Sequence, residues 1–324
     1  MAAHKHKCNM NYSGKSGGME WSAAIRMWAR SRELKLCYET MLSDGDSTAF
    51  DKVKEQNDGK GPYYDIGVTV RKIECVNHVC KRFRKALENL KMTYVKVVNG
   101  RRMKLLAGKN KLTDDVIEAL TFYYGHAIKK FAGTSVEEMR RAILAGFHHC
   151  SSTDECHNHD YCDKSVDTYC FYQKAVMNNE VPQSHSTTKV KFIVDEEGKK
   201  QIFEVYKRMT SDELLEACLH GQTQNRNESL HSRLWRYCPK SKNGSKRIID
   251  FAAAQDVANY NAGYTASHLD YYFGFPRTEI SSAYLARMDA NMDLPFKKKA
   301  KHKRKIVKDP DYEAGAASLP RNFK

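Results

Sequence analysis

The stretch Cys218–Tyr237, CLHGQTQNRNESLHSRLWRY, most constrains how this chain folds. A turn rich in Gly, Gln and Asn runs directly into a helical pattern, in which Leu230, Leu234 and Tyr237 form one apolar stripe. Glu228 lies in the first turn of the predicted helix and off this stripe, so its carboxylate can face a cavity. An acidic residue at this place also complements the helix dipole, which is the commoner reason for finding one there.

The pattern G-x-TQN-x-NES-x-HS-x-x-W within this stretch resembles the signature around the last catalytic carboxylate of Mutator-like (MULE-type) transposases. The resemblance implies an RNase H-like catalytic domain that works through Asp, Asp and Glu. It also implies transposition by metal-dependent DNA cleavage and strand transfer, with Glu228 as the third carboxylate.

A second carboxylate is expected where the first apolar strand pattern ends. Leu34–Leu42 is predicted to be a strand, and it runs into Ser43-Asp44-Gly45-Asp46-Ser47. A surface turn also explains such a sequence. The resemblance implies that Asp44 is the second catalytic carboxylate, with Asp46 as the alternate. Carboxylate oxygens are the ligands that Mg²⁺ prefers, so Asp44 and Glu228 are expected to hold Mg²⁺ or Mn²⁺.

The resemblance further implies a first catalytic Asp on an earlier strand of the same sheet. No Asp precedes Asp44, and the upstream carboxylates Glu20, Glu33 and Glu39 do not end a strand pattern. We therefore expect a truncated, fragmentary or domesticated transposase domain. It should depend on a missing N-terminal segment and be inactive alone.

Cysteine and histidine are dense in one polar insert. Asp and Ser fill the gaps between them, so no apolar pattern explains the cysteines. The eight residues are His148, His149, Cys150, Cys156, His157, His159, Cys162 and Cys170. Structural zinc sites take four Cys or His ligands, so this density predicts zinc. Reduced free thiols are the alternative.

The family resemblance narrows the zinc ligands to His149 or Cys150, followed by His159, Cys162 and Cys170. Cys156 falls where relatives often differ. A second strand is predicted at Ile66–Cys75, and a Cys-x-x-His pair, Cys75 and His78, lies where it ends, as it does in the family. This pair is either part of a zinc site shared with the insert or a buried Cys beside a capping His.

The formal net charge of +15 favours a polyanionic partner, and DNA is the partner that the resemblance implies. The expected phosphate contacts are Lys81, Arg82, Arg84, Lys85, Lys297, Lys298, Lys299, Lys301, Lys303, Arg304 and Lys305. The run from Lys297 to Lys305 also has the composition of a nuclear localisation signal, so we expect a nuclear protein. No secretory or membrane-spanning pattern is present, and the ten cysteines are better explained as thiols or metal ligands than as disulfides.

The predicted fold class is α/β (α+β), a partial RNase H-like fold with a helical, Cys/His-rich zinc-binding insertion between the second and third carboxylates. The predicted regions are 1–100 for the partial core, 101–210 for the insertion, 211–292 for the remaining core and 293–324 for a basic tail. Lys189–Tyr206 is expected to be a hairpin or a strand and turn about Gly198. The expected helices are Met19–Glu33, Ser47–Gln56, Val79–Lys91, Lys91–Gly133 with Leu112–Phe131 as its clearest segment, Ser135–Phe147, Ser211–Cys218, Arg247–Asn261 and Ala283–Met292. The expected N-caps are Ser47, Thr134 or Ser135, and Ser211 for the helices that begin at these places.

Two classes of function follow from these patterns. The first is a Mutator-like DNA strand transferase that acts with its missing segment. The second is a domesticated, non-catalytic nuclear protein that binds zinc and DNA. Besides DNA, the partners left open are a second copy of the chain, in a homo-oligomer, and the missing N-terminal segment.

Overall fold

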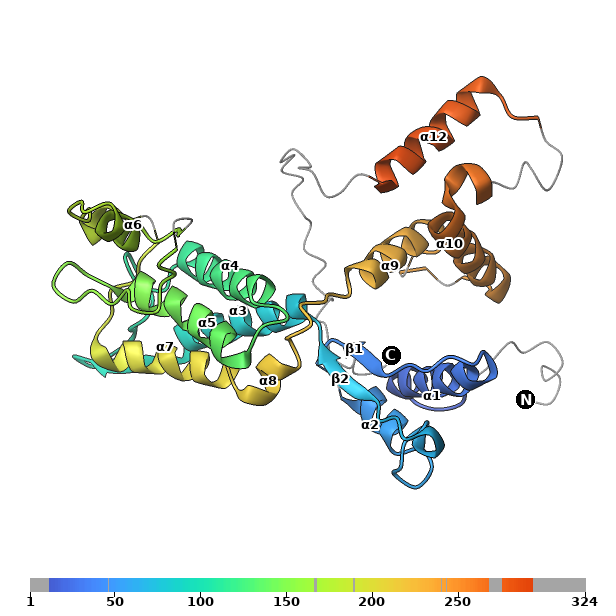
Figure 1. Cartoon of the computed structure of the whole chain (residues 1–324), viewed down its shortest axis with the longest axis horizontal. Coiled ribbons are helices and arrows are strands. Elements are labelled where there is room, and N and C mark those ends of the chain that lie inside the picture. Colours follow the sequence, from blue (N-terminus) through green and yellow to red (C-terminus); the bar gives the residue numbers. More distant parts are fainter. Residues whose placement is uncertain are drawn as a thin grey trace. The chain divides into compact units, whose positions relative to one another are not determined.

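The computed structural model describes residues 12–45, 47–165, 168–188, 190–239, 241–242, 244–267 and 276–293. The chain divides into two compact units, one formed by Glu20–Gln224 and the other by Met1–Met19 with Asn225–Lys324 (Figure 1). The described residues are mainly helical with small sheets, which gives a mixed α/β protein.

The first part of the unit Glu20–Gln224 contains a small parallel sheet. Strand β1 (Thr40–Ser43) pairs with β2 (Arg71–Glu74) in a register that sets Ser43 opposite Glu74. The same part of the chain contains the helices α1 (Gly17–Glu33) and α2 (Thr48–Lys54) and a short 3-10 helix, η2 (Tyr64–Ile66). Trp28 and Val53 are buried beside Tyr63, whose hydroxyl lies 2.5 Å from Ser31 Oγ. Both strands therefore end at the same edge of the sheet, because parallel strands share a direction.

A larger helical core completes this unit. It contains α3 (Val76–Thr93), α4 (Asp114–Lys130), α5 (Val136–Ser151), α6 (Phe171–Met177), α7 (Glu196–Met209) and α8 (Asp212–Glu216), with the 3-10 helix η3 (His185–Thr187). Helix α3 packs against α4 and α7, and α4 packs against α5 (Figure 1). At the centre, the Phe83 ring stacks on Tyr124 at 4.4 Å and meets Tyr206 edge-on at 4.9 Å. Aromatic pairs of this geometry add to the burial energy of the core.

Replacing Phe83 with Ala should lower the free energy of unfolding by about 3–5 kcal/mol, because the change leaves a cavity among buried aromatic rings. Phe83 is 0% exposed. Urea denaturation measures the effect. Phe122 in α4 is the matched control: it is 66% exposed, so Phe122→Ala should change stability by no more than about 0.5 kcal/mol. Equal effects of the two substitutions would mean that the core is not centred on Phe83.

Side-chain caps fix where several of these helices begin. Ser135 accepts from the Glu138 amide, and the Glu138 carboxylate accepts from the Ser135 amide, so α5 opens with a capping box. Ser211 caps α8 through the Leu214 amide. Both caps agree with the sequence prediction. Ser47, the cap predicted for α2, makes no side-chain capping hydrogen bond.

Two segments differ from the sequence prediction. The predicted hairpin at Lys189–Tyr206 is wrong, because α7 occupies Glu196–Met209. Asp195 caps this helix through the Gly198 amide, and apolar residues at helical spacing bury one of its faces, so Gly198 lies within the helix and not in a turn. Within Lys91–Gly133, predicted to be helical, β3 (Val95–Val98) and β4 (Arg101–Lys104) form a hairpin. Asn99 and Gly100 both have positive φ, as an Asn-Gly hairpin turn requires.

The described part of the other unit is helical. It contains α9 (Asn225–Tyr237), α10 (Lys246–Ser267) and α12 (Glu279–Asp293). Arg233 Nε donates to the buried Asp256 carboxylate at 2.7 Å, which joins α9 to α10. Gly263 interrupts α10 with a φ of 83°, and the Asp289 carboxylate of α12 accepts from the next amide, that of Tyr264. Among the described residues, no helix is both long and apolar enough to cross a membrane.

Candidate metal centre

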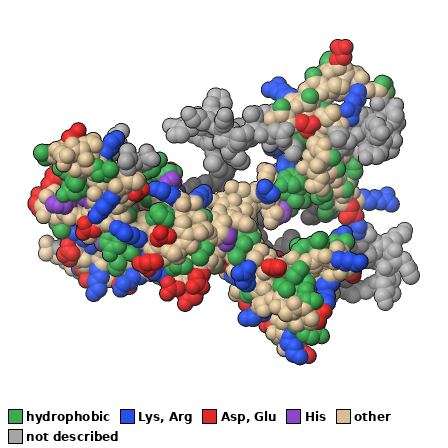
Figure 2. All heavy atoms as spheres, viewed as in Figure 1, with side chains coloured by type: hydrophobic (Ala, Val, Ile, Leu, Met, Phe, Trp, Pro, Cys, Tyr) green, Lys and Arg blue, Asp and Glu red, His purple; other side chains and the backbone are tan. Residues whose placement is uncertain are grey.

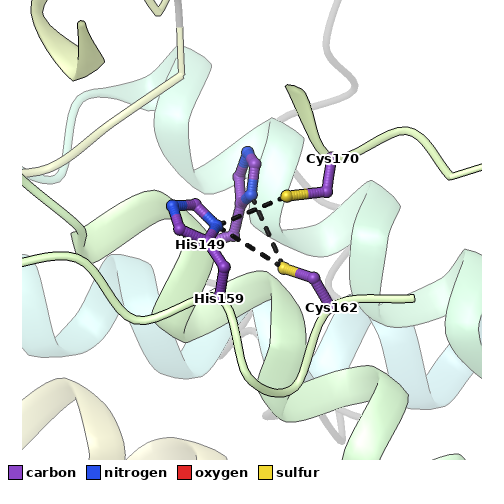
Figure 3. Close-up of side chains that lie close together, drawn as sticks. All are labelled: His149, His159, Cys162 and Cys170. Carbon is purple, nitrogen blue, oxygen red and sulfur yellow. Dashed lines mark hydrogen bonds between the residues drawn. The ribbon is translucent and has the colours of Figure 1, made fainter. Parts of the chain in front are cut away.

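Four side chains of the Cys/His-rich insert point toward one another (Figure 3): His149, His159, Cys162 and Cys170. Their potential ligand atoms all lie within 4.8 Å of one another. Cys162 Sγ lies 3.7 Å from Nδ1 of both His149 and His159, and Cys170 Sγ lies 3.4 Å from His159 Nδ1. Three of the four side chains are buried and His149 is half-buried, so the group is largely shielded from water.

Local structure brings these residues together. His149 belongs to the last turn of α5, and Cys170 is the N-cap of α6, where its sulfur accepts from the Gln173 amide. His159 and Cys162 share a tight turn, in which the Cys162 amide donates to the His159 carbonyl at 3.0 Å. Gln173 Nε2 donates to the same carbonyl at 2.8 Å and so holds the turn against α6.

The donor set fits a tetrahedral zinc ion. Typical Zn–S and Zn–N bonds place the N and S atoms of a tetrahedral site about 3.5 Å apart. The observed N···S distances of 3.4 Å and 3.7 Å match that edge length. Two imidazoles and two thiols are also ligands that zinc prefers, whereas Mg²⁺ prefers oxygen. The cluster can therefore bind a metal such as zinc without a large rearrangement.

The two cysteines affect each other's protonation. The pKa of Cys170 is lowered by a hydrogen bond from Cys162, and hydrogen bonds from His149 and His159 lower it further. The same hydrogen bond raises the pKa of Cys162, and burial adds to this effect. One sulfur is thus favoured as a thiolate, which is the form that binds metal.

The predicted catalytic carboxylates lie in different units. Asp44 directly follows β1 in the unit Glu20–Gln224 and is exposed. Glu228 is exposed in the first turn of α9, in the unit that contains Asn225–Lys324. Asp46 lies outside the described residues.

The loop after β1 is held by Lys72 and Glu74, which the sequence did not single out, together with Arg82, one of the expected phosphate contacts. Lys72 Nζ donates to the Gly45 carbonyl at 3.3 Å and pairs with Glu74 at 3.4 Å. Arg82 also pairs with Glu74, at 2.8 Å. Gly45 has a φ of 104°, and a Cβ there would lie 3.1 Å from the Arg82 guanidinium, so both the backbone and the space favour glycine next to Asp44.

Comparison with known families adds an independent observation. A family model described as Mutator-like transposase matches residues 2–170, which is more than half of the chain. The chain belongs to the Mutator-like transposase family. Neither a curated protein nor a solved structure matches it. The matched residues include Asp44 and the four clustered Cys and His side chains, whereas Glu228 lies beyond them.

Three of the other predicted zinc candidates of this Mutator-like chain lie elsewhere. Cys150 is packed in the helical core, and burial raises the pKa of its thiol to about 12. Cys75 is buried at the start of α3, where its sulfur accepts from the Gln224 amide at 3.3 Å. His78 lies one turn further along α3 and is half-buried. Among the described residues, the metal-type cluster contains neither Cys75 nor His78.

The basic residues predicted to contact DNA have mixed surroundings in this family member. Arg82 pairs with Glu74 and Arg84 with Glu88, whereas Lys81 and Lys85 are exposed on α3. Figure 2 shows acidic and basic side chains interspersed on the visible face of the helical core. The remaining candidates, from Lys297 to Lys305, lie outside the described residues.

Two residues beside the metal-type cluster were missed by the sequence analysis. His185 Nε2 lies 2.9 Å from His159 Nε2, and His185 Nδ1 lies 2.7 Å from Asp154 Oδ1. His185 is a single histidine in a polar linker, and Asp154 is one of several acidic residues in the insert. Neither residue matches a ligand spacing, so no sequence signal marked them.

Proposed function

We propose that the chain is the catalytic region of a Mutator-like transposase with an RNase H-like arrangement, in which Asp44 and Glu228 hold divalent metal ions for DNA cleavage and strand transfer. The observation that carries the proposal is the position of Asp44. It immediately follows the first of two parallel strands, within the residues that match the family. In sheets of this kind, functional groups gather at the carboxyl ends of strands.

The residues around Asp44 suit this role. The pairing of Glu74 with both Lys72 and Arg82 holds the strand end, and the Lys72 bond to the Gly45 carbonyl fixes the backbone beside Asp44. Asp44 therefore presents a carboxylate from a supported loop, which is what an oxygen ligand of Mg²⁺ needs. Bound Mg²⁺ would supply Lewis-acid activation of the attacking oxygen and would stabilise the leaving oxygen.

The proposed role of Glu228 as a metal ligand is supported by its sequence context. It lies in the first turn of α9, within the motif that resembles the family's last carboxylate. Arg233, one turn later on α9, pairs with the buried Asp256, so α9 is anchored on α10 by its other face. The Glu228 side chain is exposed.

The metal-type cluster is the proposed site of a zinc ion. His149, His159, Cys162 and Cys170 would hold one structural zinc ion, since all four positions of a tetrahedral site are taken by protein ligands. Zinc at this place would tie α5, the following turn and α6 together. The Lys297–Lys305 run would serve import into the nucleus, where the DNA substrate is found.

A DNA cleavage assay tests the catalytic proposal. The family resemblance implies three catalytic carboxylates, and Asp44 and Glu228 are the candidates for the second and third. The assay therefore has two arms. In one arm the chain acts by itself, and in the other it is joined to a strand-bearing segment with an Asp from another Mutator-like transposase. We expect nicking of duplex DNA in at least one of the two arms. This nicking should require Mg²⁺ or Mn²⁺ and should stop when EDTA is added. Salt-sensitive DNA binding without cleavage in either arm would instead favour the non-catalytic zinc- and DNA-binding protein.

A further inference from the structure

The metal-type cluster is extended by a chain of hydrogen bonds that runs away from it. His159 faces the two sulfurs with Nδ1 and faces His185 with Nε2. His185 in turn faces Asp154 through Nδ1. The sequence of contacts is therefore Asp154, His185, His159 and then the cluster.

One arrangement of protons satisfies every contact when His159 Nδ1 acts as a metal ligand. The Nδ1 atom must then be free of a proton, so the His159 proton lies on Nε2 and is donated to His185 Nε2 at 2.9 Å. His185 must accept with Nε2, so its own proton lies on Nδ1 and is donated to Asp154 Oδ1 at 2.7 Å. The carboxylate at the end of the chain thus selects the tautomer of both histidines.

Burial increases the effect of these contacts. His159 is 2% exposed and His185 is 5% exposed, so water does not compete for their ring nitrogens. The Tyr172 ring stacks on His159 at 4.5 Å between centroids, and Phe171 meets His185 edge-on at 5.3 Å. The two imidazoles are consequently held in plane and position by α6.

Asp154 is itself fixed by the segment that carries His185. The Ser184 hydroxyl donates to Asp154 Oδ2 at 2.5 Å, and the His185 amide donates to Oδ1 at 2.7 Å. These bonds join residues about thirty positions apart in the sequence, so they dock η3 onto the insert. A carboxylate with several donors is a rigid end point for the chain of hydrogen bonds.

We propose that Asp154 and His185 are positioning residues that orient His159 for metal binding and that they couple metal binding to the docking of η3. The inference rests on the proposed zinc centre. Partners of this type orient a ligating imidazole and increase its basicity, and their loss usually lowers metal affinity by about 10–100-fold. Asp154 acts through His185 and does not touch the metal.

Zinc affinity of the full chain, measured by competition with a chromophoric chelator, tests the proposal. Asp154→Ala and His185→Ala should each weaken Zn²⁺ binding by about 10–100-fold. The double variant should bind no more weakly than His185→Ala alone, since both residues act through one chain of contacts. Glu155→Ala is the matched control: Glu155 is the exposed neighbour of Asp154 and should bind zinc like the wild type.

Cobalt spectra separate a positioning role from a ligand role. With Co²⁺ in place of zinc, Asp154→Ala and His185→Ala should keep the wild-type thiolate charge-transfer and d–d bands at saturation, because the four ligands are unchanged. Cys162→Ser should alter them. Changed bands in His185→Ala would overturn the proposal by making His185 a ligand.

Hydrogen exchange tests the coupling. Zinc should slow amide exchange in residues 184–188 of the wild type and have less effect there in Asp154→Ala. Zinc affinities within twofold of the wild type in both Ala variants would overturn the proposal. A wild-type chain that binds no zinc would overturn the proposed centre itself, which is a different result.

Discussion

Cys162→Ser and His159→Ala variants should lose the zinc that the wild-type chain binds, about one ion per chain. Each substitution removes one of four clustered ligand atoms. In zinc-finger peptides, metal binding contributes about 10–16 kcal/mol to folding, so the loss should be large for a segment with little other support. Elemental analysis of the purified chain measures the zinc content.

The insert is expected to depend on this metal because it has few buried apolar side chains of its own. Between Ser152 and His185, the buried residues are mostly the cluster itself and polar groups such as Thr168 and Gln173. Amide exchange over this segment should therefore rise in the ligand variants, whereas exchange around Phe83 should stay slow. Uniformly increased exchange would mean that the cluster supports the whole helical core.

Two cysteine variants serve as controls. Cys156 is exposed, and Cys156→Ser should retain full zinc. Cys75 is buried against the Gln224 amide, and Cys75→Ser should also retain zinc even where it lowers stability. Loss of zinc in Cys75→Ser would contradict the four-residue centre and would favour a site shared between the insert and the start of α3.

The sequence predicted the candidate centre well where its residues lie close together along the chain. His159 and Cys162 lie three positions apart, and Cys170 and His149 lie nearby, so local Cys/His density marked this region. The choice between His149 and Cys150 was left open. It is decided by helix geometry: on α5, Cys150 faces the core and His149 faces the insert.

Contacts between distant segments could not be predicted in the same way. The bond from His185 to Asp154 spans thirty-one positions and depends on how η3 docks. The pairing of Glu74 with Arg82 spans only eight positions, but it combines a strand end with the next helix and so also depends on the fold. The missed β3–β4 hairpin was different, because its turn, Asn99-Gly100, is a hairpin signal that the sequence itself carries.

The fold was predicted best where caps and strand ends coincide. The capping residues of α5 and α8, and the order strand, helix, strand around Asp44, appear in the structure, with β1 and β2 shorter than the apolar runs suggested. The boundaries at residues 100, 210 and 292 stay predictions. An apolar run extends beyond a strand whenever its flanking residues pack in loops, so run length overestimates strand length.

Glu228→Gln should abolish metal-dependent DNA cleavage in the assay arm that is active, with a loss of at least about 10²–10³-fold in rate. Gln keeps the size of the side chain but removes the negative charge that a divalent ion needs. Asp44→Asn should have the same effect for the same reason. Nicking of supercoiled DNA in Mg²⁺ and in Mn²⁺ measures the rate for each variant.

The matched control separates catalysis from helix stabilisation. Glu279 lies in the first turn of α12, as Glu228 does in α9, and both are exposed. An acidic residue there stabilises a helix through its dipole by about 0.3–1 kcal/mol, so Glu228→Gln and Glu279→Gln should lower stability by similar small amounts. Only Glu228→Gln should stop cleavage. Equal cleavage by both variants would leave Glu228 with the dipole role alone and would remove it from the proposed active site.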